Sequence, residues 1–364
     1  MAFVGNGFDI QVMSEYGSAL DTRYESFFFF LKLQNFDATN VVFAEMERLR
    51  AEEKKNWSDV EGVVADLQTA GSASARQLRK ALGEIQEKFA EFLDLAVPSS
   101  LLVELGNESM SGGLAIESLS GFLADLEPAA YRQLSFPTRC DNFDLFNFVF
   151  VNFNYTSLLD NLVYLDQKQF DPLKYSTVDR NFSFRGNPKG VPDAIIRAGD
   201  TFSSYLMTEI IHPHGTQGVP RSLLFGVDQP GEVAGNWDDS LRLSKPFWGQ
   251  NDKRYASLFE TTELFIVFGC SIGKSDRWWW KSIAEVLGTA RPYSDGSDSF
   301  EPELIIYWYQ SAGENTSEDE VRRIFLEAAG KLDRLKDLER SIQVVLYTSS
   351  SDRTWLNVRS SSRV

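Results

Sequence analysis

The sequence predicts an α/β fold, a Rossmann-like and mostly parallel sheet with helices on both faces and a helical insertion between the first and second strands. Three observations predict it. Short apolar runs typical of buried strands recur along the chain, helical patterns separate the later runs, and a long stretch rich in Ala, Leu, Glu and Lys separates the first run from the second. Strands that alternate with helices are typical of βαβ units and a parallel sheet.

Five apolar runs are the expected strands. Each is short, rich in Phe, Val or Ile, and bounded by polar or turn-forming residues, which is the pattern of a strand buried on both faces. In chain order the runs are residues 2–4, 146–153, 264–268, 304–309 and 342–347.

Helices are expected at residues 274–287 and 317–340, and residues 77–95 repeat apolar side chains with the helical period. Residues 165–225 look irregular, with scattered Gly and Pro and short strand candidates. The chain is therefore divided into an α/β core of residues 1–40 and 140–347, a helical insertion or cap of residues 41–139, and a Ser/Arg-rich tail of residues 348–364 that is expected to fray.

Composition limits the classes of function. The 364 residues include 36 Lys and Arg against 52 Asp and Glu, a net charge of −16, which disfavours binding to nucleic acid or to anionic membranes. Two cysteines form neither a disulfide framework nor a metal-ligand cluster. No signal peptide and no run long enough to span a membrane is evident, so we expect a soluble, cytoplasmic protein.

Ligands of open parallel sheets bind at the carboxyl ends of the strands. The first such end is Gly5-Asn6-Gly7-Phe8-Asp9, a strand-to-helix turn whose glycines would let the backbone approach a phosphate. The full GxGxxG pattern is not met, because Ile10 occupies the third glycine position. A tight turn that merely caps its helix explains the segment equally well.

The second strand ends in polar side chains, Asn154, Tyr155 and Thr156, and the segment His212-Pro213-His214-Gly215 holds both histidines of the chain. A single His serves as a general base near neutral pH. We therefore expect one of the two imidazoles to be functional and the other to be structural.

The third strand is followed by a Gly/Ser-rich turn that includes Gly269, Ser271 and Asp276, whose amides would hold phosphate or ribose. Cys270, in the same turn, is expected to be a buried residue and not a nucleophile. At helical spacing at most two rings of Trp278-Trp279-Trp280 can face the core. In Trp57-Ser58-Asp59-Val60-Glu61 the two carboxylates are two positions apart, so on a helix they do not face each other and a helix cap is expected instead.

Taken together, these motifs resemble the bacteriophage abortive infection AbiH family. Each motif alone is weak, but their order along residues 3–280 is specific. They are Gly5 to Asp9; Thr22, Tyr24 and Phe27; Trp57, Asp59 and Glu61; Phe153 to Thr156; His212 to Gly215; Phe225 to Asp228; and Gly269, Ser271, Ser275 and Asp276.

The order of these motifs is also similar to that of sirtuin-like domains, whose defence members often destroy NAD. That resemblance implies that Asn154 orients the ribose or a water, that His214 is the base, and that the segments Gly5 to Gly7 and Gly269 to Ser271 hold the phosphates. The chain departs from it at Asn6, which replaces a small residue, and at Thr156, which replaces an Asp.

The functional expectation is therefore a phage-defence protein that binds a nucleotide such as NAD and cleaves its nicotinamide–ribose bond, without a metal. The alternative is a nucleotide-sensing or partner-binding module without turnover, in which a protein partner, a phage-derived trigger or a second copy of the chain would use Phe27 to Phe30 and the Trp triplet. A third, weaker option is a metal-dependent phosphoesterase that would use His212, His214, Asp9, Asp228 or Asp276.

Overall fold

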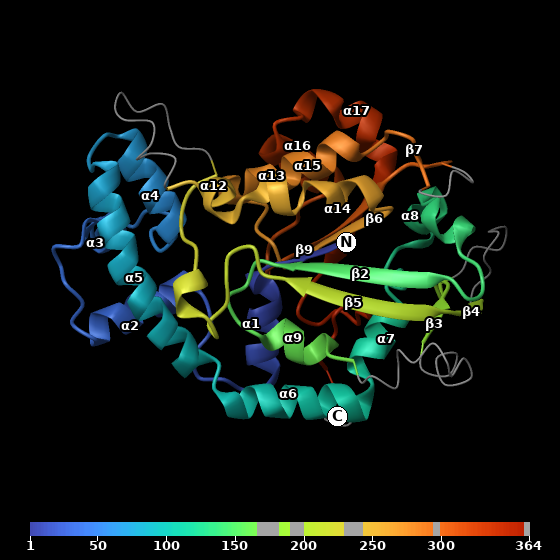
Figure 1. The fold of residues 1–364 in the computed structure, drawn as a ribbon, viewed down its shortest axis with the longest axis horizontal. Helices are drawn as coiled ribbons and strands as arrows, with labels where there is room; N and C mark the ends of the chain where they lie inside the picture. Colours follow the sequence, from blue (N-terminus) through green and yellow to red (C-terminus); the bar gives the residue numbers. More distant parts are fainter. Residues whose placement is uncertain (166–181, 190–199, 229–242, 294–298, 360–364) are drawn as a thin grey trace.

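A computed structural model of the chain describes residues 1–165, 182–189, 200–228, 243–293 and 299–359. Six parallel strands form the main sheet (Figure 1), and their order across it is β10-β9-β6-β1-β2-β5. The strands are β1 (Ala2–Val4), β2 (Leu145–Asn152), β5 (Tyr205–Ile211), β6 (Leu264–Phe268), β9 (Glu303–Tyr309) and β10 (Ile342–Tyr347). The predicted α/β fold with a mostly parallel sheet is confirmed.

The strand order identifies where a ligand would lie. From β1 the chain proceeds outward through β2 to β5, then returns to the other side of β1 and proceeds outward through β6 and β9 to β10. This is the doubly wound order 3-2-1-4-5-6, in which the crevice lies between the two central strands, here β1 and β6. The register places Val4 of β1 beside both Asn152 of β2 and Phe268 of β6, so the three turns that follow emerge together.

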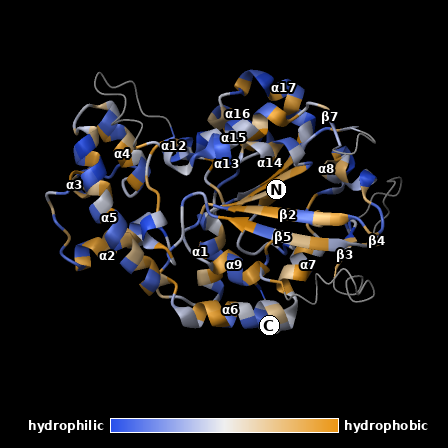
Figure 2. Ribbon diagram, viewed as in Figure 1, coloured by the Kyte–Doolittle hydropathy of each residue, from blue (hydrophilic) through white to orange (hydrophobic). Residues whose placement is uncertain are grey.

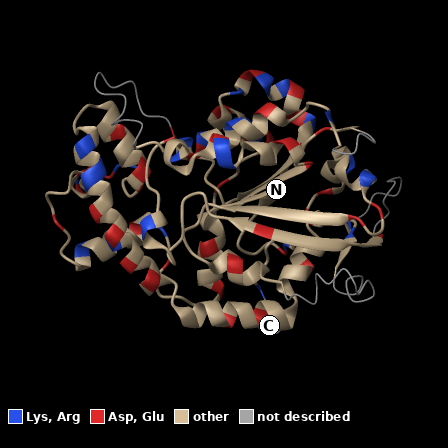
Figure 3. Cartoon of the chain, viewed as in Figure 1, with Lys and Arg blue, Asp and Glu red and all other residues tan. Residues whose placement is uncertain are grey.

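Alternate residues of β1 enter two separate cores. Ala2 and Val4 pack into a large core with the helices that follow β1, whereas Phe3 packs with Trp279 and Trp280 on the opposite face. Figure 1 shows α14 (Ala256–Thr261), α15 (Arg277–Val286), α16 (Glu318–Ala329) and α17 (Leu335–Leu338) over this second face. It shows α1 (Asn6–Glu15), α7 (Leu114–Ser120) and α9 (Leu158–Val163) over the first. The strands are largely apolar in Figure 2 and nearly free of charge in Figure 3, as a sheet covered on both faces requires.

Helices fill the interval between β1 and β2, and Figure 1 shows α3, α4 and α5 grouped beside the sheet. The long amphipathic α5 begins at a capping box in which Ser74 and Gln77 exchange hydrogen bonds. The helices of this interval are α1 (Asn6–Glu15), α2 (Tyr24–Leu33), α3 (Val41–Ala51), α4 (Val60–Thr69), α5 (Ala75–Ala96), α6 (Ser99–Gly112), α7 (Leu114–Ser120) and α8 (Pro128–Gln133).

The later helices include α15 and α16, which pack on each other beside β10. The helix expected at 317–340 is divided, because Gly330 ends α16 in the left-handed conformation. These elements are α9 (Leu158–Val163), α12 (Lys245–Gly249), α13 (Asn251–Arg254), α14 (Ala256–Thr261), α15 (Arg277–Val286), α16 (Glu318–Ala329) and α17 (Leu335–Leu338), with the small antiparallel pairs β3 (Ser183–Arg185) with β4 (Thr201–Ser203) and β7 (Arg291–Pro292) with β8 (Ser299–Phe300).

Two sequence expectations need correction. The interval 165–225, expected to be irregular with short strand candidates, contains β5, an edge strand of the main sheet. The tail was expected to fray from Thr348, but the side chains of Trp355, Leu356 and Val358 are 0–1 % exposed. The backbone amides of Thr354 and Trp355 donate to the carboxylate of Asp125, which holds the tail against the large core. Residues 360–364 lie outside the described residues.

Candidate functional site

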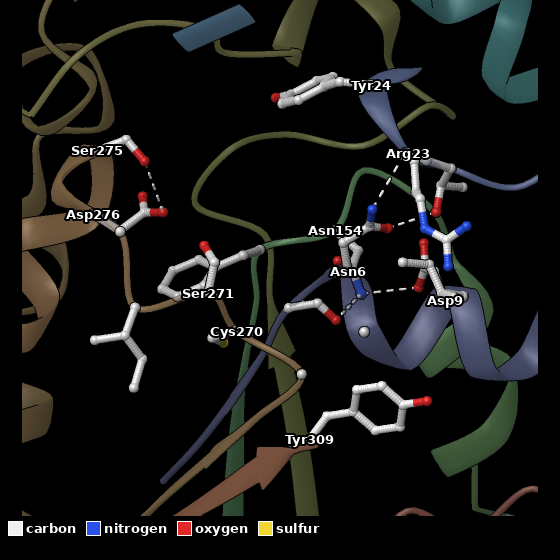
Figure 4. A pocket seen from close by; sticks show the side chains of 18 of the residues that line it. Asn6, Asp9, Arg23, Tyr24, Asn154, Cys270, Ser271, Ser275, Asp276 and Tyr309 are labelled. Carbon is white, nitrogen blue, oxygen red and sulfur yellow. Dashed lines mark hydrogen bonds between the residues drawn. The ribbon is translucent and has the colours of Figure 1, made fainter. Parts of the chain in front are cut away.

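A cleft of about 1770 Å³ opens at the carboxyl ends of the central strands. Segments far apart in the sequence line it, including the turn after β1, the start of α4, the turn after β5 and the turn after β6. Figure 4 shows side chains from the first and last of these segments on two sides of the cleft. Its lining includes Thr22, Tyr24, Asp59, Glu61, Asn154, Tyr155, Thr156, His214, Asp228, Ser271, Ser275 and Asp276. The scattered motifs of the sequence therefore meet at one place.

The glycines of the first turn are required by contact with the turn after β6. A Cβ on Gly7 would lie 2.8 Å from the Cα of Gly269, and a Cβ on Gly5 would lie 2.6 Å from the Gly269 carbonyl oxygen. The amide of Gly7 donates to that same oxygen at 2.9 Å, and the amide of Phe8 donates to the Gly5 carbonyl. These amides are engaged within the protein, so the two glycines serve turn packing here, and Phe8 lies in the core.

Asn6, the first departure from the sirtuin-like pattern, ties the next loop to the turn. Its Oδ1 accepts a hydrogen bond from the hydroxyl of Thr22, and its Nδ2 donates to the Thr22 carbonyl. Tyr24, at the start of α2, follows this tether and lines the cleft. An Asn at this position thus fixes one wall of the cleft.

Asp9 is buried at the floor of the cleft with both carboxylate oxygens occupied. Asn154 Nδ2 donates to Oδ1 at 2.8 Å and the Thr156 hydroxyl donates to Oδ2 at 2.7 Å. Burial raises the pKa of Asp9 to about 7, although these two hydrogen bonds oppose the shift. Thr156, the second departure from the sirtuin-like pattern, is therefore the partner of an acid that the first turn supplies.

Both side-chain N–H groups of Asn154 are engaged in hydrogen bonds within the protein. Its amide group donates to the Gly5 carbonyl at 3.1 Å as well as to Asp9, which uses both N–H bonds. Figure 4 shows these bonds joining the end of β2 to the start of α1. Any ligand or water that Asn154 contacts through its side chain would meet the Oδ1 acceptor.

A chain of buried charges runs along the cleft from α4 to His214. Lys245 Nζ lies 2.9 Å from Glu61 Oε2 and 2.8 Å from Asp276 Oδ1, and His214 Nε2 lies 3.2 Å from the same Asp276 oxygen. Glu61, Lys245 and His214 are buried, and 18 % of the Asp276 side chain is exposed. Their arrangement orients the imidazole by a carboxylate, as in sites where a His is a general base.

Burial and the attraction between opposite charges determine the pKa values of these linked side chains. Burial raises the pKa of Glu61, and Lys245 only partly opposes that shift. Burial would also raise the pKa of Asp276, but Lys245 and His214 together hold it well below its ordinary value. Burial disfavours the charge on Lys245, yet the two carboxylates raise its pKa. Among these four linked side chains, Asp276 is therefore the anion and Lys245 is the cation.

The two histidines have separate surroundings. His214 lines the cleft and its ring lies 5.0 Å from that of Phe153. His212 is not part of the lining and contacts Asp160 at 3.0 Å through Nε2. Gly215 is also outside the lining. Its φ of 85° belongs to a turn that packs against Ser222. Of the two candidate bases, His214 is the one that a ligand in the cleft can reach.

Two other expectations concern the turn after β6. Ser271 and Cys270 both line the cleft, and Cys270 is partly buried and not fully buried as expected. Its thiol is directed to the carbonyls of Phe3 and Phe268, and desolvation raises its pKa well above the ordinary value. Trp279 and Trp280 are buried and Trp278 is half-buried. The indole nitrogen of Trp278 donates to Asp252.

Sequence reasoning overlooked Lys245 and undervalued Glu61. Asp59 caps α4 as expected, but the helix then directs Glu61 to Lys245, which lies 184 residues away in the sequence. Lys245 precedes Pro246 in a short helix and forms no recognisable motif. Only the placement of α12 beside α4 reveals it.

Neither the metal option nor a membrane span has structural support in the described part of the chain. There, no three His, Cys, Asp or Glu side chains form a group that could hold a metal ion. No described helix is both long and apolar enough to cross a bilayer.

Comparison with known proteins gave one match. Searches of curated proteins and of solved structures found nothing similar. The family model described as Bacteriophage abortive infection AbiH matches residues 1–292, well over half of the chain, and so includes every motif that the cleft brings together. The chain therefore belongs to the bacteriophage abortive infection AbiH family.

Proposed function

We propose that this AbiH protein binds a nucleotide such as NAD in the cleft and hydrolyses its nicotinamide–ribose bond. The observation that carries the proposal is the position of the His214–Asp276 pair at the crevice between β1 and β6. Doubly wound sheets of this order bind dinucleotides there, and a His held by a carboxylate is suited to general base catalysis.

In the proposed reaction the C1′–N bond breaks and its electron pair stays on nicotinamide, which leaves neutral. Positive charge develops on the ribose, water adds to C1′, and its proton passes to His214. If Nε2 carries its hydrogen toward Asp276, Nδ1 is the basic nitrogen that receives the proton. Asn154 contributes as an acceptor through Oδ1, because its donors are engaged by Gly5 and Asp9.

The test is incubation of the purified protein with NAD and chromatography of nicotinamide. His214→Gln should lower release at least about 100-fold, the usual contribution of a general base. His212→Gln is the matched control, because that ring lies outside the cleft lining and should leave most of the release intact. Equal release from the wild type and His214→Gln would refute the assignment of the base.

One observation favours the alternative of binding without turnover. The donors of Asn154 and the amide of Gly7 are satisfied within the protein, as in a site whose parts are fixed structurally. Under this alternative calorimetry would show one NAD bound per chain and chromatography would show no nicotinamide. Failure to bind any nucleotide would count against both functions.

A further inference from the structure

We infer that the cleft contains a second subsite that stacks a purine base, on the β9–β10 side of the sheet and away from His214. Its contact surface is the exposed ring of Tyr309, which the ring of Tyr347 supports and the buried ring of Phe268 backs; these three rings are called the aromatic shelf. The inference rests on the proposed function for the identity of the ligand, but its geometry is independent of the chemistry at His214.

The shelf is built at the carboxyl ends of three adjacent strands. Phe268 ends β6, Tyr309 ends β9 and Tyr347 ends β10. The rings of Phe268 and Tyr347 stack with centroids 5.7 Å apart, and Tyr309 packs at 64° to Tyr347 with centroids 5.5 Å apart. Tyr309 is supported from one side and remains 47 % exposed.

The docked tail holds the shelf in place. The guanidinium of Arg353 lies 4.5 Å from the ring centroid of Phe268 and 4.7 Å from that of Tyr347. Its own donors bind the Trp355 carbonyl and Gln11, so the cation, which also lines the cleft, is fixed against the rings. A stack supported in this way loses little conformational freedom when a ligand binds.

The shelf and the catalytic end belong to one cleft. Tyr309 and Tyr347 line it together with Asp9 and His214, and Figure 4 shows the ring of Tyr309 projecting toward the start of α1. The volume of about 1770 Å³ exceeds the roughly 300–1000 Å³ of a pocket for one small ligand. The cleft therefore has room for a ligand that spans both halves of the sheet.

A purine is the occupant that fits these features. Exposed aromatic rings bind bases by stacking, which requires a flat π surface and no charge. Thr348, Ser349 and Ser351 line the cleft beside the shelf and bring hydroxyl groups suited to the edge of a base or to a ribose. Because nicotinamide and its ribose are assigned to the His214 end, the adenine half of NAD is assigned to the shelf.

The experiment is calorimetric titration of the full chain with two half-ligands, AMP and nicotinamide mononucleotide. Tyr309→Ala should weaken AMP binding about 5- to 150-fold, as the loss of one stacking ring does, and leave nicotinamide mononucleotide unchanged. Tyr309→Phe keeps the ring and should bind AMP within about twofold of the wild type. Tyr164→Ala, a change at an exposed tyrosine outside the cleft lining, is the matched control.

Undiminished AMP binding by Tyr309→Ala, or an equal loss for both half-ligands, would overturn the subsite. Loss of AMP binding alone would support it even if the wild type released no nicotinamide from NAD. Loss of AMP binding in the variant together with no nicotinamide release by the wild type would support the purine subsite and refute the proposed hydrolysis.

Discussion

The imidazole Nε2 of His214 lies 3.2 Å from Asp276 Oδ1, and a second pair, His212 and Asp160, repeats the arrangement at 3.0 Å outside the cleft lining. One chain thus contains a candidate catalytic pair and its internal control. If the cleft pair is catalytic, Asp276→Asn should lower nicotinamide release about 10²- to 10⁴-fold, while Asp160→Asn should retain most of it. Equal losses in the two variants, measured by chromatography on folded protein, would contradict the assignment.

Removal of Lys245 should destabilise the protein. Lys245→Met leaves the buried carboxylates of Glu61 and Asp276 without their cation, which costs about 3–5 kcal/mol of unfolding free energy for a buried pair. Lys281→Met is the control, because Lys281 forms an exposed pair with Glu285 and the loss should stay below about 1 kcal/mol. Urea unfolding measures both, and similar values for the two variants would show that the network is not stabilising.

Asp9 should make stability depend on pH. Its folded pKa of about 7 exceeds the ordinary value of 3.8, so the folded state holds a proton that the unfolded chain releases between these values. The contribution is fully present below about pH 3.8 and is lost as the pH rises through 7, on the order of 4 kcal/mol for three pKa units.

Asp9→Asn cannot ionise, so its unfolding free energy should fall less than that of the wild type between pH 4 and pH 8. Asp94→Asn, at an exposed position, should follow the wild type. Parallel pH profiles for Asp9→Asn and the wild type, from urea unfolding at several pH values, would show that Asp9 releases its proton at an ordinary pH.

Substitution to Ala should have opposite effects on stability at Gly269, which lies in the contact between the two central turns, and at Gly83, which lies on an open helix surface. Gly269→Ala places a Cβ 2.8 Å from the Phe8 nitrogen at a φ of 65°, and should cost more than about 1 kcal/mol. Gly83→Ala lies in α5 with no atom within 4 Å of the new Cβ and should stabilise the helix by about 0.5–1 kcal/mol. A thermal midpoint for Gly269→Ala at or above that of the wild type would refute the close approach.

Trp355 is predicted to be a core residue of the tail. Trp355→Ala should cost about 3–5 kcal/mol, because the ring is fully buried and stacks on Phe150. Trp248→Ala is the matched control, since that ring is 51 % exposed and its removal should cost under 1 kcal/mol. Unfolding in urea compares the two, and a small cost at Trp355 would restore the expectation of a frayed tail.

The sequence predicted the strands that are buried on both faces, because continuous apolar runs such as residues 264–268 leave little alternative. It gave only short strand candidates in the interval that contains β5 and did not assign that strand to the main sheet, because Met207 and Glu209 face solvent at its edge. It also could not predict the docked tail, because burial there depends on Asp125, a single acid more than 200 residues away whose carboxylate accepts two tail amides.

The order of the motifs along the chain predicted which residues meet at the site, but it did not predict the chemical role of each residue. The motifs predicted that Asn154 and His214 would approach one cleft, and both line it. The partners that determine what each can do came only from the structure, since Asp9 engages the donors of Asn154 and Lys245 connects Glu61 to Asp276.

The contact between Gln11 and Arg353 joins residues 342 positions apart. Contacts of such long sequence separation slow folding, because a large loop must close before they form. During synthesis α1 emerges long before the tail that packs on it, so the part of the cleft wall that the tail forms is missing until residues beyond 350 have left the ribosome. The cleft is therefore incomplete until the tail has docked, and a nascent chain without the tail cannot bind a ligand that requires both of its halves.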